Sequence, residues 1–352
     1  MRTVSRAVAL AAVITATAFM SLAQQAPTSG PYKVLKAAKV GSEGGYDYVF
    51  ADVDGRRLYV PRGGAAGGQV MVFNLDTLES TGAVADVRAG GATVDPKSHH
   101  GFSTTKPLTM WDANTLKVIK TIDVDGRPDG ILCDPYNARV WVLSHQAPHA
   151  TVIDAADGTV VKTLDLGGAP EQAVSDGKGT MYINIADKAN IAVVDAKSLT
   201  VTAHYDMSSK GTGGSGLAFD AKNRILFAYY RQPMPVVVVV NADNGNIITA
   251  LPTGTGVDTV AFNPATMEAI SAENAGTMTF IKENSPTSFV VEQTLQTMVG
   301  AKTLALDTKT NRLFTMAAEF GPPAPDAPPG PAGRPARGPM VAGSFSILMV
   351  GK

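Results

Sequence analysis

Acidic residues recur at one position of a short motif that is repeated along this sequence. In each copy a variable residue lies shortly after a glycine and leads into an apolar run ending in Asp or Asn, as in GRPDGILCD and GAPEQAVSD. The variable position carries four acids: Asp47, Asp129, Glu171 and Asp258. Two carboxylates about 6 Å apart repel by roughly 3 kcal/mol at an effective dielectric constant of about 20. If the fold gathers these acids, they therefore favour a compensating cation, either a metal ion or a positively charged ligand.

The variable positions are spaced almost evenly along the chain. Besides the four acids they include Gly90, Ser215 and Lys302, and each position lies about 40 to 45 residues after the one before it. This period is typical of a four-stranded β-propeller blade. The sequence therefore predicts an all-β fold, a seven-bladed β-propeller of four-stranded antiparallel blades.

Shorter patterns inside each unit predict the individual strands and turns. Runs of β-branched and aromatic residues, such as RRLYVPRG (56–63) and ARVWVLSH (138–145), are typical of strands. Asp or Asn begins the turn after the third run, as in DAADG and DAKSL, and its side chain is expected to bond the backbone two residues on. The last unit stops after its third strand, whereas residues 32–40 resemble the fourth strand of another unit. We therefore expect the N-terminal strand to close the last blade, which removes an exposed sheet edge.

The first residues are typical of a secretory signal peptide over residues 1–23. Arg2 and Arg6 precede an apolar run, and small residues permit cleavage after Ala23. The alternative, a membrane anchor, needs a longer apolar run. We therefore expect a periplasmic or secreted protein that is not membrane-embedded after signal cleavage.

The rest of the chain is expected to form one domain, because a closed propeller of this length is a single unit. We place a flexible lead at residues 24–31, the propeller at residues 32–352, and a Pro-rich loop insert at residues 320–341. The single cysteine, Cys133, has no internal disulfide partner and is expected to be a core thiol.

Composition narrows the range of partners. The chain has 45% hydrophobic and 17% charged residues and a formal net charge of −1. It can bury a large core, and it lacks the basic excess that nonspecific nucleic-acid binding requires. We expect no nucleic-acid partner. We expect instead a monomer that binds a small molecule or a protein.

Blade topology indicates where the variable residues lie. The loop that enters the first strand and the loop that leaves the second strand lie at the same end of a blade, so both are expected to surround one mouth of the central channel. The ligand-binding candidates in the ring and its rim are therefore Asp47, Asp129, Glu171, Ser215, Asp258, Lys302, Arg62, His145 and Arg231. Lys302 is one candidate for the compensating cation. A metal ion is the other, and its oxygen ligands would be Asp129, Glu171 and Asp258, a donor set that favours Ca²⁺.

The repeats also carry a family resemblance. The segments RRLYV, ARVWV, DAADGTVVKTL and DAKSLTV resemble YVTN repeats, and the chain is similar to YncE-like secreted seven-bladed propellers over nearly all of residues 32–352. The resemblance implies the fold and export, but no single function, because this fold hosts many activities. Two features depart from the pattern: Gly90 at the ring position and the Pro-rich insert in the seventh unit.

Several interpretations of the acids stay open. Each acid could accept backbone N–H bonds from a neighbouring blade and lock the ring. A non-catalytic propeller could instead hold a small ligand, a cation or a partner at the mouth. A lactonase-type hydrolase could use a carboxylate or His145 as base, with Arg62 or Arg231 stabilising an oxyanion. We favour binding and assign no catalytic residue, because the sequence has no GxSxG, HExxH or CxxC motif. A quinone cofactor is suggested only by kinship with quinoprotein propellers.

Overall fold

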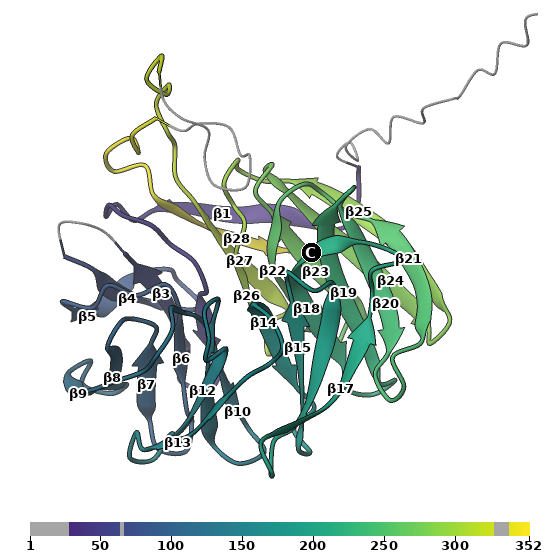
Figure 1. The fold of residues 1–352 in the computed structure, drawn as a ribbon. Helices are drawn as coiled ribbons and strands as arrows, with labels where there is room; N and C mark the ends of the chain where they lie inside the picture. The colour runs from purple at the N-terminus through teal and green to yellow at the C-terminus, as the bar shows by residue number, and fades with distance from the viewer. Residues whose placement is uncertain (1–27, 64–66, 327–337) are drawn as a thin grey trace, which may run out of the picture.

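The computed structural model describes residues 28–63, 67–326 and 338–352, which form seven four-stranded sheets arranged in a ring (Figure 1). Neighbouring strands within each sheet are antiparallel, and no helix occurs within these ranges. The predicted seven-bladed β-propeller is therefore confirmed. The predicted signal peptide, residues 1–23, lies outside the described residues.

The strands repeat in the same order in every blade. The inner strands are β2 (Phe50–Asp52), β6 (Ala92–Val94), β10 (Pro128–Asp134), β14 (Pro170–Ser175), β18 (Thr212–Asp220), β22 (Val257–Asn263) and β26 (Leu304–Asp307). The second strands are β3 (Arg57–Arg62), β7 (His100–Ser103), β11 (Arg139–Ser144), β15 (Thr180–Ile185), β19 (Ile225–Gln232), β23 (Glu268–Glu273) and β27 (Arg312–Ala317). The third strands are β4 (Gln69–Asn74), β8 (Leu108–Asp112), β12 (Ala150–Asp154), β16 (Asn190–Asp195), β20 (Val236–Asn241), β24 (Thr277–Ser285) and β28 (Ser346–Gly351). The outer strands are β5 (Ser80–Ala85), β9 (Val118–Ile122), β13 (Val160–Leu164), β17 (Thr200–Asp206), β21 (Ile247–Pro252), β25 (Ser288–Gln296) and β1 (Lys33–Lys39).

The N-terminal strand closes the ring as predicted. Strand β1 pairs antiparallel with β28, so the seventh sheet has the order β1-β28-β27-β26 (Figure 1). Ahead of β1, the Thr28 N–H donates to the Thr294 carbonyl of β25 at 2.9 Å, and the Tyr32 ring stacks on Phe280 at 3.8 Å. Part of the segment that we expected to be a flexible lead therefore contacts the sixth blade.

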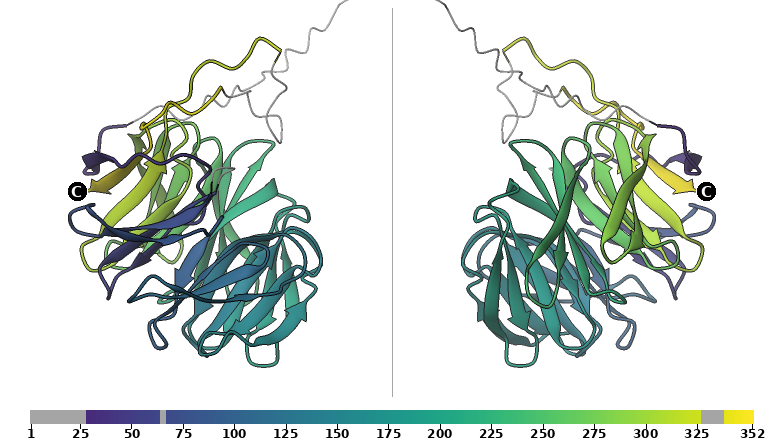
Figure 2. Two further views of the ribbon diagram at one scale, coloured as in Figure 1. Left: turned by 90° about the vertical axis from the view of Figure 1, so that its left-hand side faces the viewer. Right: turned by 90° about the vertical axis from the view of Figure 1, so that its right-hand side faces the viewer.

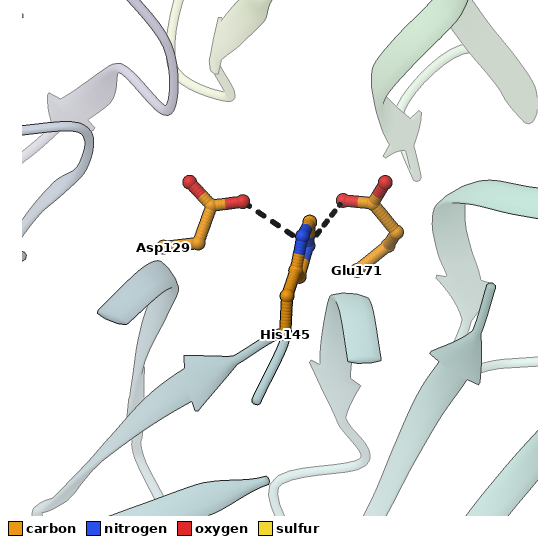
Figure 3. A group of neighbouring side chains, drawn as sticks. All are labelled: Asp129, His145 and Glu171. Atoms are coloured by element: carbon orange, nitrogen blue, oxygen red, sulfur yellow. Dashed lines mark hydrogen bonds and ion pairs between the residues drawn. The ribbon is translucent and has the colours of Figure 1, made fainter. Parts of the chain in front are cut away.

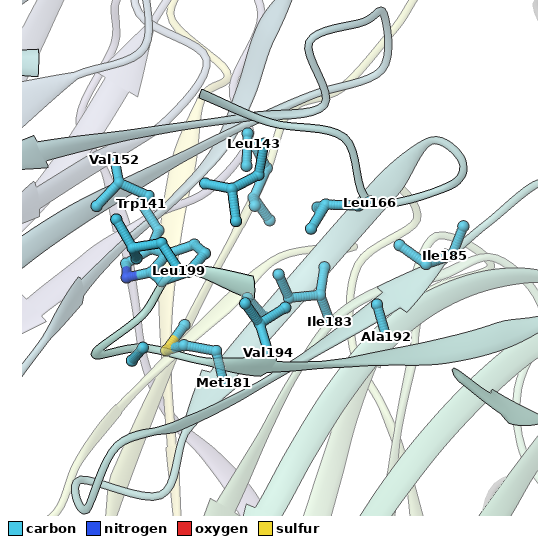
Figure 4. Close-up of a cluster of buried hydrophobic side chains, with 14 residues drawn as sticks. Trp141, Leu143, Val152, Leu166, Met181, Ile183, Ile185, Ala192, Val194 and Leu199 are labelled. Atoms are coloured by element: carbon cyan, nitrogen blue, oxygen red, sulfur yellow. The ribbon is translucent and has the colours of Figure 1, made fainter. Parts of the chain in front are cut away.

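Apolar side chains fill the spaces between blades. Between the third and fourth blades, Trp141 and Leu143 of β11 cluster with Met181, Ile183 and Val194, and all five are almost fully buried (Figure 4). Each buried side chain of this size contributes about 1.5 to 3 kcal/mol. Six further clusters of this kind, described within the same ranges, pack neighbouring blades against one another.

Asx turns end the third strands, as predicted. The Asp154 carboxylate accepts the Ala156 N–H at 2.8 Å, and Asp195 accepts the N–H groups of Lys197 at 3.0 Å and Ser198 at 2.6 Å. These acids satisfy backbone donors at turns, which makes them structural.

The described ends of the Pro-rich insert extend from the body of the propeller (olive and yellow in Figure 2). The Gly321 N–H donates to the Pro339 carbonyl, and the Val341 N–H donates to the Glu319 carbonyl, both at 2.9 Å. The base of the insert is therefore a hydrogen-bonded ribbon. The described part of the chain contains no apolar helix of membrane-spanning length.

Candidate functional site

Five of the seven ring positions carry side chains that form one network at the channel mouth. The inner strands of neighbouring blades contact one another, so residues near their starts lie close together. Two side chains from the ends of second strands join the network: His145 directly follows β11, and Arg231 lies near the end of β19. The members of the network are Asp47, Asp129, Glu171, Asp258, Lys302, His145 and Arg231.

Four of these residues, Asp47, Lys302, Asp258 and Arg231, form what we call the paired half. The Lys302 Nζ lies 3.1 Å from Asp47 Oδ1 and also donates to Asp258 Oδ2. The Arg231 Nη2 lies 2.9 Å from Asp258 Oδ1, and its Nε donates to the Val257 carbonyl at 3.0 Å. Both oxygens of Asp258 are therefore held by permanent cations.

Burial and neighbouring charges shift the pKa values of the paired half in opposite directions. Burial alone would raise the pKa of Asp258, but Lys302 and Arg231 hold that pKa below its usual value. Burial would lower the pKa of Lys302, but Asp258 and Asp47 raise it. The pKa of Asp47 is raised by burial and by the charge of Asp258. Lys302 therefore stays charged at neutral pH, and Asp258 is the carboxylate that it neutralises most strongly.

The other three residues, Asp129, His145 and Glu171, form what we call the open half (Figure 3). The His145 Nε2 lies 3.2 Å from Asp129 Oδ2 and 3.3 Å from Glu171 Oε2, so two carboxylates converge on one ring nitrogen. Glu171 also accepts the Tyr48 hydroxyl at 3.2 Å and lies 3.4 Å from Arg231 Nη1, which joins the two halves.

Positive charge is scarce in the open half. The hydrogen bond with Glu171 raises the pKa of His145, with a further contribution from the charge of Asp129. Burial raises the pKa of Asp129, and the charge of Glu171 adds to this rise. Two carboxylates therefore share one imidazole and a long contact to Arg231, whereas Asp258 alone has two cations.

The hydrogen bonds that the described residues make to these four carboxylates come from side chains. Their donors are Lys302, Arg231, His145 and Tyr48. A backbone lock would instead need N–H groups of neighbouring blades at the carboxylate oxygens. The arrangement is that of a charged site whose side chains face one another.

Two of the predicted site residues lie apart from this network. Ser215 is fully buried, and its hydroxyl donates to the Tyr229 carbonyl of its own blade at 3.4 Å. Arg62 is buried with its guanidinium 3.5 Å from the centre of the Phe345 ring, and its Nη2 donates to the Ser42 carbonyl at 3.1 Å. Neither residue supplies the nucleophile or the oxyanion contact that a hydrolase would need beside His145.

Tyr48 is a site residue that sequence reasoning missed. It follows the ring residue Asp47, a place that Gly91 and Gly130 fill in the next two blades. A Cβ on Gly91 would lie 3.2 Å from the Tyr48 Cβ, and one on Gly130 would lie 3.5 Å from its Cζ. An aromatic residue followed by glycine at the equivalent position of the next two blades was the available signal, because the two glycines leave room for the ring to reach Glu171.

A cavity of about 390 Å³ lies in the channel below the open half. Its walls come from six inner strands and their flanking residues, and are mostly apolar. Tyr48, Gly130, Leu143 and Glu171 line it beside the mouth, and Cys133 lines it farther along β10. Burial raises the pKa of the Cys133 thiol to about 12, so this cysteine is a neutral wall residue.

The residues that could hold a metal differ from the predicted set. The ligand atoms of Asp129, His145 and Glu171 all lie within 4.8 Å of one another. Asp258, predicted as the third ligand, has its oxygens on Lys302 and Arg231 instead. Asp129, His145 and Glu171 thus offer both nitrogen and oxygen ligand atoms, unlike the all-oxygen set expected for Ca²⁺.

Comparisons with known proteins agree on the architecture. No family model matches the sequence, and no curated protein sequence matches it. The structure is similar to a chain of the Mitotic Checkpoint Complex, with a TM-score of 0.68 and 12% identity over 88% of this chain and 96% of that chain. It is also similar to a chain of Kuenenia stuttgartiensis hydrazine synthase, with a TM-score of 0.66 and 14% identity over 79% of this chain and 94% of that chain. At this identity the likeness shows the β-propeller fold alone.

Proposed function

We propose that this protein is a non-catalytic binding propeller that holds a small positively charged ligand at its acid-lined channel mouth. The proposal rests on one observation: Asp129 and Glu171 converge on a single imidazole nitrogen of His145, while the nearby Asp258 is neutralised by two cations. A unit positive charge about 4 Å from one carboxylate gains roughly 4 kcal/mol at an effective dielectric constant of 20, before desolvation is counted. The open half is where such a charge is most favourable.

The cavity beside the open half supports the same proposal. Ligand sites are commonly concave and apolar, with a few converging polar groups that fix orientation. Here Glu171 and Tyr48 line both the mouth and the channel cavity of about 390 Å³. A ligand bound at the mouth therefore has space to extend into the channel.

A thermal-shift screen with chelator-treated protein tests the proposal. The probes are Ca²⁺, Zn²⁺, spermidine and lysine amide, each followed by calorimetric titration. We expect at least one of these cations to raise the melting temperature of the native protein and to lose that effect in the Asp129→Asn/Glu171→Gln double variant. The matched control is Asp54→Asn/Asp243→Asn, which removes two exposed surface carboxylates and should keep the effect. A shift that persists in the mouth variant, or no shift with any of the probes, contradicts the proposal.

We also propose that the protein is an exported member of the YncE-like propellers. The YVTN-like repeats and the charged, apolar and small residues of positions 1–23 support this. Mass spectrometry of the protein expressed in a bacterium should find a mature N-terminus at Gln24 in the periplasm or medium. An uncleaved chain confined to the cytoplasm would overturn this part of the proposal.

Hydrolysis of a lactone is the second candidate function. The contact of His145 with two carboxylates, which raises the imidazole pKa, favours it because such a group can act as a general base. Ring opening of a lactone panel by the native protein, lost in His145→Gln, would replace the binding proposal. The absence of turnover would leave binding as the function.

A further inference from the structure

One imidazole nitrogen and two carboxylate oxygens, all of them possible metal-ligand atoms, meet in the open half. The His145 Nε2 lies 3.2 Å from Asp129 Oδ2 and 3.3 Å from Glu171 Oε2, as the dashed lines in Figure 3 show. In a tetrahedral zinc site with bonds of about 2.0 to 2.1 Å, ligand atoms lie about 3.3 Å apart. Two of the three separations already match that geometry, and the third is no longer than 4.8 Å.

The contacts of His145 Nε2 cannot both be ordinary hydrogen bonds at one time. A ring nitrogen carries at most one hydrogen, and an ionised carboxylate has none to donate. Asp129 and Glu171 therefore compete for the same hydrogen. A metal ion in place of that hydrogen would contact all three donor atoms, which removes the competition and offsets the excess negative charge.

We propose that Asp129, His145 and Glu171 bind a divalent transition-metal ion, with Zn²⁺ the best match. This inference rests on the proposed function and specifies the cation at the same mouth. Imidazole nitrogen suits Zn²⁺, Cu²⁺ and Ni²⁺, whereas Ca²⁺ takes six to eight oxygen ligands. Asp258 is unable to complete an all-oxygen set because Lys302 and Arg231 hold both of its oxygens.

Neighbouring groups orient one ligand and leave a coordination position open. The Tyr48 hydroxyl donates to Glu171 Oε2 at 3.2 Å, and Arg231 Nη1 donates to Glu171 Oε1 at 3.4 Å, so both oxygens of this carboxylate are oriented. Such outer contacts tune metal affinity. Three protein ligands leave a fourth tetrahedral position, as in zinc sites that bind a water or a further ligand. The channel cavity, which Glu171 lines, is an independent feature that provides space for that ligand.

A glycine borders the site on the side of Asp129. A Cβ on Gly90 would lie 3.7 Å from Asp129 Oδ1 and 3.4 Å from Thr104 Oγ1. A longer side chain at this ring position would occupy the space beside the carboxylate. Glycine at the ring position of the second blade therefore leaves room beside Asp129 Oδ1.

Calorimetric titration of the metal-free, full-length mature protein tests this inference. Chelator-treated protein is titrated with Zn²⁺ and, separately, with Ca²⁺. We expect one equivalent of Zn²⁺ to bind, and we expect His145→Gln to weaken Zn²⁺ binding at least tenfold. The matched control is His149→Gln in the same loop, because His149 Nδ1 contacts the single carboxylate of Asp165 at 2.7 Å. This variant should bind Zn²⁺ like the native protein.

Cobalt substitution gives a readout that a structural role of His145 would not produce. Co²⁺ bound by the three residues should show visible ligand-field absorption that changes in His145→Gln and is unchanged in His149→Gln. If His145→Gln fails to fold, as circular dichroism would reveal, Asp129→Asn takes its place with the same expected tenfold loss.

Two results with the divalent metals would overturn the metal site, and two further results with the full set of probes would do the same. One is native-like Zn²⁺ affinity in folded His145→Gln and Asp129→Asn. The other is Ca²⁺ binding as tight as Zn²⁺ binding and unaffected by His145→Gln, which would indicate oxygen donors elsewhere. Binding of spermidine or lysine amide without Zn²⁺ binding would also reject the metal site while keeping the proposed function. Failure of all four cations would reject both.

Discussion

Asp258 and Asp129 occupy equivalent positions in the sixth and third blades, but their surroundings differ. Asp258 bonds both Lys302 and Arg231, and its pKa is held low by those cations against the effect of burial. Within the described residues, the Asp129 carboxylate pairs with the imidazole that it shares with Glu171, and its pKa is raised by burial and by the charge of Glu171. The ring position therefore determines where a carboxylate lies, while side chains from other blades determine whether it is neutralised. The paired half balances its two carboxylates with two cations, whereas the open half places two carboxylates around one imidazole, the arrangement on which the proposed cation site rests.

The largest expected effect is in the paired half. Lys302→Met should lower the free energy of unfolding by about 3 kcal/mol, because it leaves Asp47 and Asp258 facing each other without their shared cation. Urea unfolding at pH 7 measures this loss. Lys309→Met is the control, since Lys309 pairs with the exposed Asp54 and should cost less than about 0.5 kcal/mol. Equal losses in the two variants would show that the paired half is not a stabilising network.

The same substitution should have opposite effects in the two halves. Asp258→Asn should destabilise the protein by about 2 kcal/mol, because Lys302 and Arg231 lose a charged acceptor. Asp129→Asn, in chelator-treated protein, should stabilise it by about 0.5 kcal/mol, because it removes a carboxylate whose charge is disfavoured by burial and by repulsion with Glu171. Urea unfolding of the two variants at pH 7 checks the signs. Destabilisation of similar size in Asp258→Asn and Asp129→Asn would show that the two halves do not differ in charge balance.

The pH dependence of these two effects provides a further check. The pKa of Asp129 is raised in the folded state, so its ionisation destabilises the protein only above the unfolded value of about 3.9, and Asp129→Asn should have no effect at pH 3. The pKa of Asp258 is lowered by its two cations despite burial, so its contribution is complete above about 3.9 and is lost as pH falls through the folded pKa. At pH 5 the effect of Asp258→Asn should therefore be undiminished.

Among the site variants, the smallest expected loss of stability is at the border of the open half and the channel. Tyr48→Phe removes the hydroxyl that donates to Glu171 and keeps the ring, so we expect a loss of about 1 kcal/mol in stability and about a tenfold decrease in Zn²⁺ affinity. Denaturant unfolding and calorimetric titration measure the two losses. Tyr136→Phe, at an exposed tyrosine outside the network, is the control and should change neither. An unchanged Zn²⁺ affinity in Tyr48→Phe would mean that the hydroxyl does not orient the ligand.

Most of the fold was accessible from local sequence patterns. The spacing of the repeated motif predicted seven blades, and the likeness of residues 32–40 to an outer strand predicted the closure by β1. Strand alternation and Asx turns such as that of Asp154 depend on residues close together in the chain, so they can be seen without knowing the fold. The family relationship and the site of action did not follow from these patterns, because the same blades support many activities.

The chain's own periodicity was enough to place Asp47, Asp129, Glu171, Asp258 and Lys302 at one mouth of a seven-bladed ring. Which of them neutralise one another was settled only in three dimensions. Lys302 reaches Asp47 across 255 residues of sequence, and Tyr48 reaches Glu171 across 123. Ser215 and Arg62 belong to the predicted set, but in three dimensions they contact Tyr229 and Phe345 and lie away from the network. Charge balance depends on distances of a few ångströms between side chains of different blades, and no repeat pattern within one blade carries that information.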